Sequence, residues 1–483
     1  MRALHSLKVK TWDKREACHQ SAFHRSVFLG GVLLILSSGI SGVKSETMSS
    51  ALANAYATNP DVNQQRASLR ATDESLPQAL ALGRPSIMGS GQYGFNHRFS
   101  SLPGRNGAFG GLFNNDIGYV NGSLNQNIFN GNQTVNSVRQ AESTILGGRE
   151  TLRNTEQSVL QNGATAYMDV LRDTAVLELR RNNIIVLMEQ LRQTRYRFNV
   201  GDVTRTDVAQ AESSLETARS DYFTAQANLQ TSIANFRQVI GRQPKQLEAA
   251  ATVEKLLPSN LDTAISVALL EHPSIQEALH NVDAAAAQVK IIEGQLYPKV
   301  DLNATTQRTF NVNGMTGYQQ YNGTIQGQMS VPIYENGGTT YSRIRQAKEQ
   351  VTQARLQADL QKTNVRAALV SAWGQLTTAR ATIESSMAAV KASEIALEGV
   401  RVEAQVGQRT TLDVLNAQQT LLGNRVALVT AQRDRVVASY VVMAAMGKLT
   451  ATNLHLAVVH YDPSVHFDQV KDKWVGVRTP DGR

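Results

Sequence analysis

The sequence predicts an α+β membrane protein in which a long α-helical barrel is joined to a transmembrane β-barrel, with two structural repeats per chain. Three observations predict this class: an internal repeat, strands with one apolar and one polar face, and proline-free helical segments longer than a globular domain needs. The composition agrees. Hydrophobic residues make up 42% and aromatic residues only 6%, and the abundant alanine favours long helices over compact cores.

Residues 1–45 have the composition of a secretory signal peptide. Basic residues precede the apolar stretch VFLGGVLLIL at 27–36, and Val43, Lys44 and Ser45 form a small-residue cleavage site before Glu46. That stretch is too short to span a bilayer, so a membrane anchor is the weaker interpretation. The segment carries seven lysines and arginines against two acidic residues, a net +5, so cleavage lowers the formal charge from +8 to +3.

The mature chain offers no chemistry that points to an enzyme. Without a basic patch interleaved with aromatics, nucleic acid is excluded as a partner. The only cysteine, Cys18, is lost with the signal, and no cofactor motif, metal spacing or nucleophile–base pattern is present. We interpret the mature histidines as scattered surface residues, although the three in the tail leave a weak metal site open: His97, His272, His280, His455, His460 and His466.

The internal repeat organises the rest of the chain. Pro60 and Pro85 recur 213 residues later as Pro273 and Pro298, and beyond them matching residues are 206 apart, so the first copy has the longer loop. We expect a first structural repeat at 46–243, a linker at 244–260, a second repeat at 261–451 and a C-terminal tail at 452–483 without a recognisable motif.

Each copy begins with a helix followed by two strands. Helices are predicted from Met48 to Leu82 and from Leu261 to Leu296, each ending before a proline. The period then changes to two: apolar residues from Tyr321 to Ile333 alternate with Asn, Thr, Gln and Ser, and the first copy shows a rougher version. Strands of about ten residues with one polar face fit a membrane barrel. Four strands cannot close one, so several chains must complete it together. An exposed soluble hairpin is the alternative.

One very long helix, a turn and a long return helix follow in each copy. No proline occurs from Gly131 to Val200, which at 1.5 Å per residue is about 100 Å of helix. The return helix carries a coiled-coil seam of apolar and small residues. Its members are Val208, Ala211, Leu215, Ala218, Tyr222, Ala225 and Leu229. The second copy starts the same seam at Val414 and interrupts it at Asn424.

The sequence of the turn between the long helices occurs twice in related form. It reads GDVTRTDVAQAESSL at 201–215 and GQRTTLDVLNAQQTL at 407–421. The glycines suit a left-handed helix end. Thr204 and Thr410 can cap the next helix, with Asp207 and Asp413 as capping-box partners. Capping alone is a sufficient account of both aspartates. A secreted or surface coiled-coil scaffold or adhesin without a pore remains the alternative for the whole chain.

At these residues the chain resembles the TolC family of bacterial outer-membrane channel-tunnels. The resemblance covers nearly the whole mature chain, including the repeat, the proline-led strands and both turns. It implies a homotrimer with 12 strands and 12 helices in the outer membrane and periplasm, contacting outer-membrane lipid. It also implies a passive exit duct for efflux or type I secretion, docked through a periplasmic adaptor to an inner-membrane ABC or RND transporter.

The resemblance gives the turns a role as the periplasmic entrance, which opens by untwisting of a helix pair. It places Asp413 and Asn416 at the pore constriction, and Thr206, Asp207 and Arg409 in a network that locks the entrance. The implied adaptor-docking residues are Val200, Gly201, Thr204, Val406, Gly407 and Thr410. Two departures, Asn416 in place of an acidic residue and Ala404 in place of a tyrosine, put the strength of the lock and the binding of cations in question.

Overall fold

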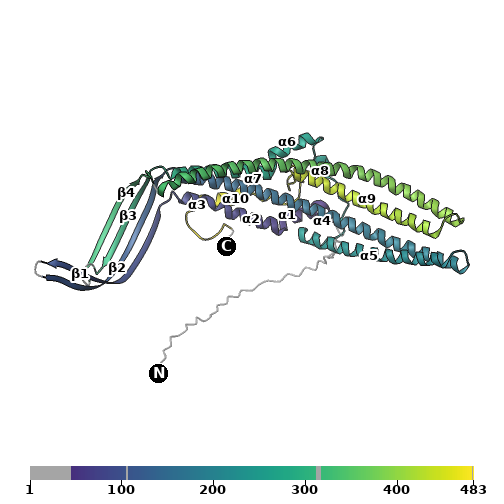
Figure 1. Cartoon of the computed structure of the whole chain (residues 1–483), viewed down its shortest axis with the longest axis horizontal. Coiled ribbons are helices and arrows are strands. Elements are labelled where there is room, and N and C mark those ends of the chain that lie inside the picture. The colour runs from purple at the N-terminus through teal and green to yellow at the C-terminus, as the bar shows by residue number, and fades with distance from the viewer. Residues whose placement is uncertain (1–44, 105–106, 312–316, 335, 481, 483) are drawn as a thin grey trace, which may run out of the picture. The chain divides into compact units, whose positions relative to one another are not determined.

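The computed structural model describes residues 45–104, 107–311, 317–334, 336–480 and 482, and residues 45–483 form one compact unit. The predicted signal peptide lies outside the described residues, apart from Ser45. Figure 1 shows the sheet at one end of the long helices and both helical turns at the other. The helices are α1 (Met48–Thr58), α2 (Pro60–Asp73), α3 (Ser75–Ala81), α4 (Gln133–Asn199), α5 (Arg205–Ile240), α6 (Leu261–Glu271), α7 (Pro273–Gly294), α8 (Thr339–Gln405), α9 (Thr411–Ala445) and α10 (Pro463–Val470).

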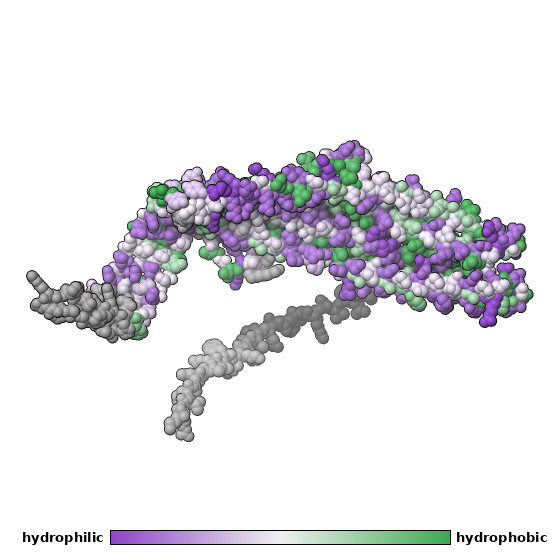
Figure 2. Space-filling model, viewed as in Figure 1, coloured by the Kyte–Doolittle hydropathy of each residue, from purple (hydrophilic) through white to green (hydrophobic). Residues whose placement is uncertain are grey.

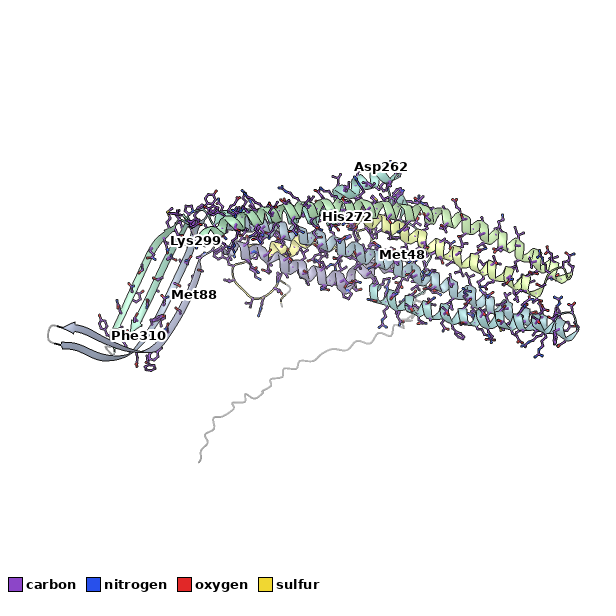
Figure 3. The ribbon with its side chains drawn as sticks, viewed as in Figure 1. Met48, Met88, Asp262, His272, Lys299 and Phe310 are labelled. Carbon is purple, nitrogen blue, oxygen red and sulfur yellow. The ribbon has the colours of Figure 1, made fainter. Side chains whose placement is uncertain are left out.

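Four antiparallel strands form one sheet in the order β1 (Ser86–Gly104), β2 (Gly107–Asn130), β3 (Lys299–Phe310), β4 (Gln319–Ser330). The pairing of β2 with β3 joins the two halves of the chain, from Gly118 opposite Phe310 to Asn130 opposite Lys299. Lys299 and Phe310 mark the two ends of β3 in Figure 3. Within the chain, β1 and β4 are the edges of this sheet.

The prediction of ten-residue strands is wrong for the first hairpin. Strands β3 and β4 have 12 residues each, whereas β1 has 19 and β2 has 24. Both strands are rich in glycine, which has no side chain to show the alternation of apolar and polar residues, so their ends cannot be recognised from the sequence pattern. Every residue of β4 is exposed, including its apolar members. The apolar side chains of β4 are therefore uncovered in the single chain. In the view of Figure 2, hydrophilic and hydrophobic residues lie side by side over the sheet.

The long helices confirm the sequence expectation. Helices α4 and α8 have 67 residues each without a break, about 100 Å at 1.5 Å per residue. Near the sheet α4 packs against α2, α3 and α7, and α7 packs against α8. Toward the turns α4 packs against α5 and α9, and α8 packs against α9. The second copy therefore packs on the first along much of α4.

The leading helix of each copy is not continuous, and both predicted spans are wrong. Residues 48–82 form three helices, separated at Pro60 and at Glu74, and residues 261–296 form two, separated at Pro273. A proline interrupts the helix because it lacks the backbone N–H that an interior helix position donates. Asn59 and His272 cap the helices that follow, each accepting a hydrogen bond from a backbone N–H two residues on. His272 marks the second break in Figure 3.

The largest buried cluster lies where α1 and the linker meet α4, α5 and α9. Tyr167 on α4 is fully buried, and its hydroxyl lies 2.7 Å from the carbonyl of Glu46 and 2.8 Å from that of Glu248. The linker is also tied to the second copy, because Glu254 accepts hydrogen bonds from Arg380 on α8 and Arg435 on α9. The start of the mature chain and the linker thus brace the middle of the long helices.

The C-terminal tail, in which the sequence shows no recognisable motif, packs on the first copy. It contains α10, which packs on α2 through a buried contact of 2.8 Å between His466 Nδ1 and Asp73 Oδ2. The interpretation of His466 as a surface residue is therefore wrong. Among the described residues, no cluster of histidine, cysteine or acidic side chains is arranged to hold a metal ion.

No helix in the described ranges combines the length and hydropathy needed to cross a membrane.

Candidate functional site

The two turns between the long helices have the same backbone geometry. In the first, α4 ends at Asn199 with Val200 as its C-cap, and Gly201 takes a left-handed φ of 82°. Asp202 N–H then donates to Arg197 O at 2.9 Å, the long bond of a Schellman cap. In the second, Gly407 has φ 80°, and Gln408 N–H donates to Glu403 O at 2.9 Å. A left-handed conformation at both positions explains why glycine recurs there.

Each turn is closed by the predicted capping box, which the structure confirms. In the first turn, Thr204 N–H donates to Asp207 Oδ2 at 2.8 Å, and Asp207 N–H donates back to Thr204 Oγ1 at 3.3 Å. The second repeats this pattern with Thr410 and Asp413 at 3.0 and 3.2 Å. Each carboxylate also accepts from its threonine hydroxyl. Each cap therefore satisfies backbone donors that the start of a helix leaves unpaired.

The caps hold both aspartates in the charged form. The pKa of Asp207 is lowered chiefly by the hydrogen bond from the Thr204 side chain, and that of Asp413 chiefly by the bond from the Thr410 backbone N–H. Asp413 is only partly exposed, and Asn416, one turn further along α9, is exposed. A carboxylate that stays charged in this position suits a cation-selective constriction, but it serves the cap as well.

An ion pair spans each turn. The basic partner lies on the long helix in the first turn, and the acidic partner lies there in the second. In the first, Arg197 at the end of α4 donates to Asp202 at 2.6 Å. In the second, Glu403 at the matching position of α8 accepts from Arg409 at 2.8 Å. Within one chain the predicted lock residues are therefore in two places. Thr206 and Asp207 lie in the first turn of α5, whereas Arg409 is paired with Glu403 of its own turn. Sequence analysis missed Glu403 and Arg197, although both lie at the same place in the repeat, 206 residues apart.

The turns present apolar side chains to solvent, and the helices behind them are closely packed. Val200 and Val406 are 62% and 66% exposed, which leaves both free for a partner. Ala404, by contrast, is buried against Val414 between α8 and α9. In this chain position 404 is thus a packing residue, small enough to let the two helices approach. Gly201, Thr204, Thr206, Gly407 and Thr410 are all exposed.

The predicted coiled-coil seam forms the packing between α4 and α5. Ala211, Leu215 and Ala218 are buried in one cluster with Leu187 and Leu191 of α4. Leu415 of α9 joins the same cluster and so connects the two helical hairpins just behind Asp413. Asn424, which interrupts the second seam, donates to Ser393 Oγ of α8 at 3.1 Å. The interruption is therefore a paired polar contact across the helix interface.

Comparison with known proteins agrees with this architecture. Residues 51–242 and 264–448 match the family model described as outer membrane efflux protein, one segment for each copy. The chain is 40% identical to the outer membrane efflux protein BepC of Brucella suis over 95% of this chain and 97% of the relative. It is 26% identical to TolC of Escherichia coli over 86% and 85% of the two chains.

Among solved structures, the Campylobacter jejuni CmeC outer membrane channel superposes with a TM-score of 0.74 at 16% identity, covering 88% of this chain and 89% of that one. Its low identity means that it shows the fold alone. The family match and the 40% identity extend over most of the chain. The chain belongs to the outer membrane efflux protein family.

Proposed function

We propose that three copies of this chain assemble into one duct, with a 12-stranded barrel in the outer membrane and a 12-helix tunnel in the periplasm. The chain is an outer-membrane exit duct of efflux and secretion systems, as its relatives are, and this family is one of channels rather than enzymes. The observation that carries the trimer is the sheet. Its edge strands β1 and β4 each pair with only one strand of the described sheet, and an open edge is not tolerated in lipid.

Four helices and four strands per chain supply one third of each barrel. The strands β1 to β4 continue into α3, α4, α7 and α8, so a copy that pairs its β4 with the β1 of the next would also bring α8 beside the neighbouring α3. The exposed side chains of β4 include Tyr321, Ile325 and Met329, each more than 60% exposed. Such residues suit the lipid-facing side of a barrel.

The domain limits follow the same scheme. Residues 1–45 are the signal peptide, 46–243 and 261–451 the two structural repeats, 244–260 the linker and 452–483 the tail. The family match supports the repeats, because it covers one segment in each.

At the opposite end, the two turns form the periplasmic entrance. We assign its constriction to Asp413 and Asn416. Three copies of Asp413 around one narrow opening would favour cations, and with Asn416 in place of a second acidic ring the selectivity rests on Asp413 alone. Thr206, Asp207 and Arg409 form the lock between hairpins of neighbouring copies, with Glu403 as the partner that holds Arg409 in place.

Partner docking belongs to the exposed parts of the same turns. A periplasmic adaptor contacts Val200 and Val406 together with the neighbouring backbone, and links the duct to an inner-membrane transporter of the ABC or RND class. The exposed valines support this proposal, because apolar side chains at a protruding turn are typical of contact surfaces. Opening then requires the entrance end of the α8–α9 hairpin to untwist away from α4 and α5, where Leu415 joins their buried cluster. Further from the turns α9 stays bound to α4, for example through the ion pair of Arg433 with Asp169.

The proposal is tested by counting chains. The mature chain lacks cysteine once the signal is removed. A variant with Ser90→Cys on β1 and Asn322→Cys on β4 carries one thiol on each edge, in the same row of the sheet. A bifunctional maleimide should convert the membrane-inserted double variant into dimers and trimers and nothing larger, while either single variant stays monomeric under denaturing electrophoresis. A ladder that continues beyond three chains, or no cross-link between inserted chains, would contradict the trimer.

A further inference from the structure

The last part of the chain runs back along the first copy toward the sheet. After α10, whose Val470 is fully buried, the chain reaches Arg84, which lies between α3 and β1. Figure 1 shows this last segment as a loop near α3. Arginines of the first copy lie over aromatic rings of the tail at three points along this route. The pairs are Arg66 with Tyr461 at 5.1 Å, Arg149 with Phe467 at 5.3 Å and Arg84 with Trp474 at 4.6 Å. Such cation–π contacts fix the path of the tail.

The final contact places the tail at the level where the sheet begins. Arg84 donates from Nη1 to the carbonyl of Lys473 at 2.8 Å while its guanidinium covers the ring of Trp474. Ser86, the first residue of β1, is only two residues further on. At about 3.3 Å per residue, the strand starts about 7 Å from this contact.

The tail there forms a closed loop that exposes its apolar side chains. Lys473 Nζ donates to the carbonyl of Arg478 at 2.7 Å, and Gly476 takes a φ of 113° that allows the chain to turn. Trp474, Val475 and Val477 between them are 65%, 86% and 101% exposed. We call residues 473–478 the tail loop.

Other exposed aromatic residues flank the same end of the sheet. Tyr297, just before β3, is 59% exposed, and Tyr334, just after β4, is 71% exposed. Exposed aromatics at the end of membrane strands form the belt that lies among lipid headgroups. Trp474 extends this level beyond the sheet itself, onto the helical side of the boundary.

We propose that the tail loop is a lipid anchor that inserts Trp474, Val475 and Val477 into the periplasmic leaflet of the outer membrane. The inference rests on the proposed function, which places the sheet in that membrane. Its occupant is phospholipid: the apolar side chains enter the boundary of the acyl chains, and the cationic Lys473, Arg478 and Arg84 face the phosphates. The proximity of the loop to β1 and its charge argue for lipid over a protein partner. The anchor fixes the depth of the helical tunnel below the membrane.

The absence of cysteine from the mature chain allows a direct test. Val477→Cys and Val459→Cys each replace a valine of the tail whose side chain is at least 95% exposed, so neither should disturb folding. Val459 lies beside Ser49 and Ser50 at the start of α1. Helices α1, α2 and α3, with 11, 14 and 7 residues, lie between that point and Arg84 and together make about 48 Å of helix. Each variant is labelled with an environment-sensitive nitrobenzoxadiazole probe and reconstituted as full mature protein into phosphatidylethanolamine–phosphatidylglycerol vesicles.

The probe at 477 should lose most of its emission to lipids that carry a nitroxide near the headgroup, and little to iodide in the buffer. The probe at 459 should show the reverse. Adding Trp474→Ser to the Val477→Cys variant should reduce the lipid quenching, because the largest inserted side chain is gone. A probe at 477 quenched by iodide alone would overturn the anchor, and one shielded from both quenchers would assign the loop to a protein contact instead.

Flotation of the vesicles separates this proposal from the one on which it rests. If the protein floats with the vesicles while the probe at 477 stays in water, the duct is supported and the anchor is contradicted. Protein that does not float contradicts both.

Discussion

Asp207 and Asp413 each form a helix cap with the threonine three residues earlier, whatever role their charge has in a pore. Each carboxylate accepts two hydrogen bonds from its threonine, one from the backbone N–H and one from the hydroxyl, and the aspartate N–H donates a third back to that hydroxyl. These bonds lower the pKa of both aspartates more than burial raises it. A substitution at Asp413 therefore changes a helix cap and a charge together. Only a pair of matched variants can separate the two effects, and the repeat supplies them.

The caps themselves can be tested at the threonines. Replacement of Thr204 or Thr410 by alanine should cost about 1 kcal/mol of local helix stability, as the loss of other N-caps does. Amide hydrogen exchange in the first turn of α5 or α9 should then accelerate about fivefold, the factor that 1 kcal/mol corresponds to. Thr217→Ala is the control, because its hydroxyl only bonds the carbonyl of Ser213 within α5. Equal acceleration in the control would contradict the capping role.

His272 predicts a pH dependence with a defined sign. Burial lowers the pKa of His272 from 6.5 to about 4, and its Nδ1 accepts from the backbone N–H of Ser274, which requires the neutral ring. Because the folded pKa is depressed, this contribution is complete above pH 6.5 and is lost as the pH falls toward 4. The loss is on the order of 2–3 kcal/mol by linkage.

The first copy provides the matched substitution. Asn59 caps α2 at the place where His272 caps α7, and an asparagine does not titrate in this range. His272→Asn should keep the cap and flatten the decrease of the thermal midpoint between pH 7.5 and 4.5. If the variant and the parent lose stability in parallel, the titrating group lies elsewhere.

Residue-level prediction from sequence succeeded where the chemistry is local. The spacing of Thr and Asp in the turns is sufficient to predict both capping boxes, because partners three residues apart must meet at the start of a helix. It failed where the partner is distant. Nothing near His466 predicts its contact with Asp73, which is 393 residues away and buries both side chains.

At the scale of elements, the helix α9 carries the contact between the two hairpins. Leu415 and Leu421 lie on the same helix and are both 6% exposed, yet Leu415 packs into the cluster of α4 and α5 and Leu421 into that of α8 and α9. The two leucines differ in which interface they stabilise. They therefore separate the opening of the entrance from general loss of packing.

Truncation of either leucine to alanine should lower stability by 2–5 kcal/mol, roughly the range for buried leucines. Only Leu415→Ala should ease the movement of the α8–α9 hairpin and raise the open probability of single channels. The two variants are compared by melting temperature and by single-channel recording at equal temperature. An equal rise in open probability for Leu421→Ala would contradict a specific role of the contact between hairpins.

Elements with a long regular pattern were predictable, and elements set by tertiary packing were not. The 67-residue helices α4 and α8 follow from uninterrupted periodicity and the absence of proline. The breaks at Pro60 and Pro273 were underestimated, because alanine-rich flanks favour helix on both sides. The length of β1 and β2 and the existence of α10 depend on pairing and docking that a local pattern does not record.

At the scale of the whole molecule, a single chain has two kinds of surface that lack a partner. The sheet has open edges and an uncovered apolar face, and the turns at the other end expose valines. In the duct proposed above, membrane, neighbouring copies and an adaptor would cover all of them. A coiled-coil scaffold without a pore would explain the long helices and leave the sheet without a purpose, and membership of the efflux family decides against it.

The central claim is that the chain forms a passive duct whose entrance is narrowed by Asp413. Single-channel recording of the mature protein in planar bilayers, with a salt gradient to measure ion selectivity, tests it most directly. Asp413→Asn and Asp207→Asn both keep an oxygen that can accept the cap hydrogen bonds and remove one charge. The parent should show small, cation-selective openings. Asp413→Asn should lose selectivity, while Asp207→Asn should open more widely and remain cation-selective. Selectivity unchanged by Asp413→Asn would reduce that residue to a helix cap, and inserted trimers without any conductance, even as Asp207→Asn, would contradict the duct.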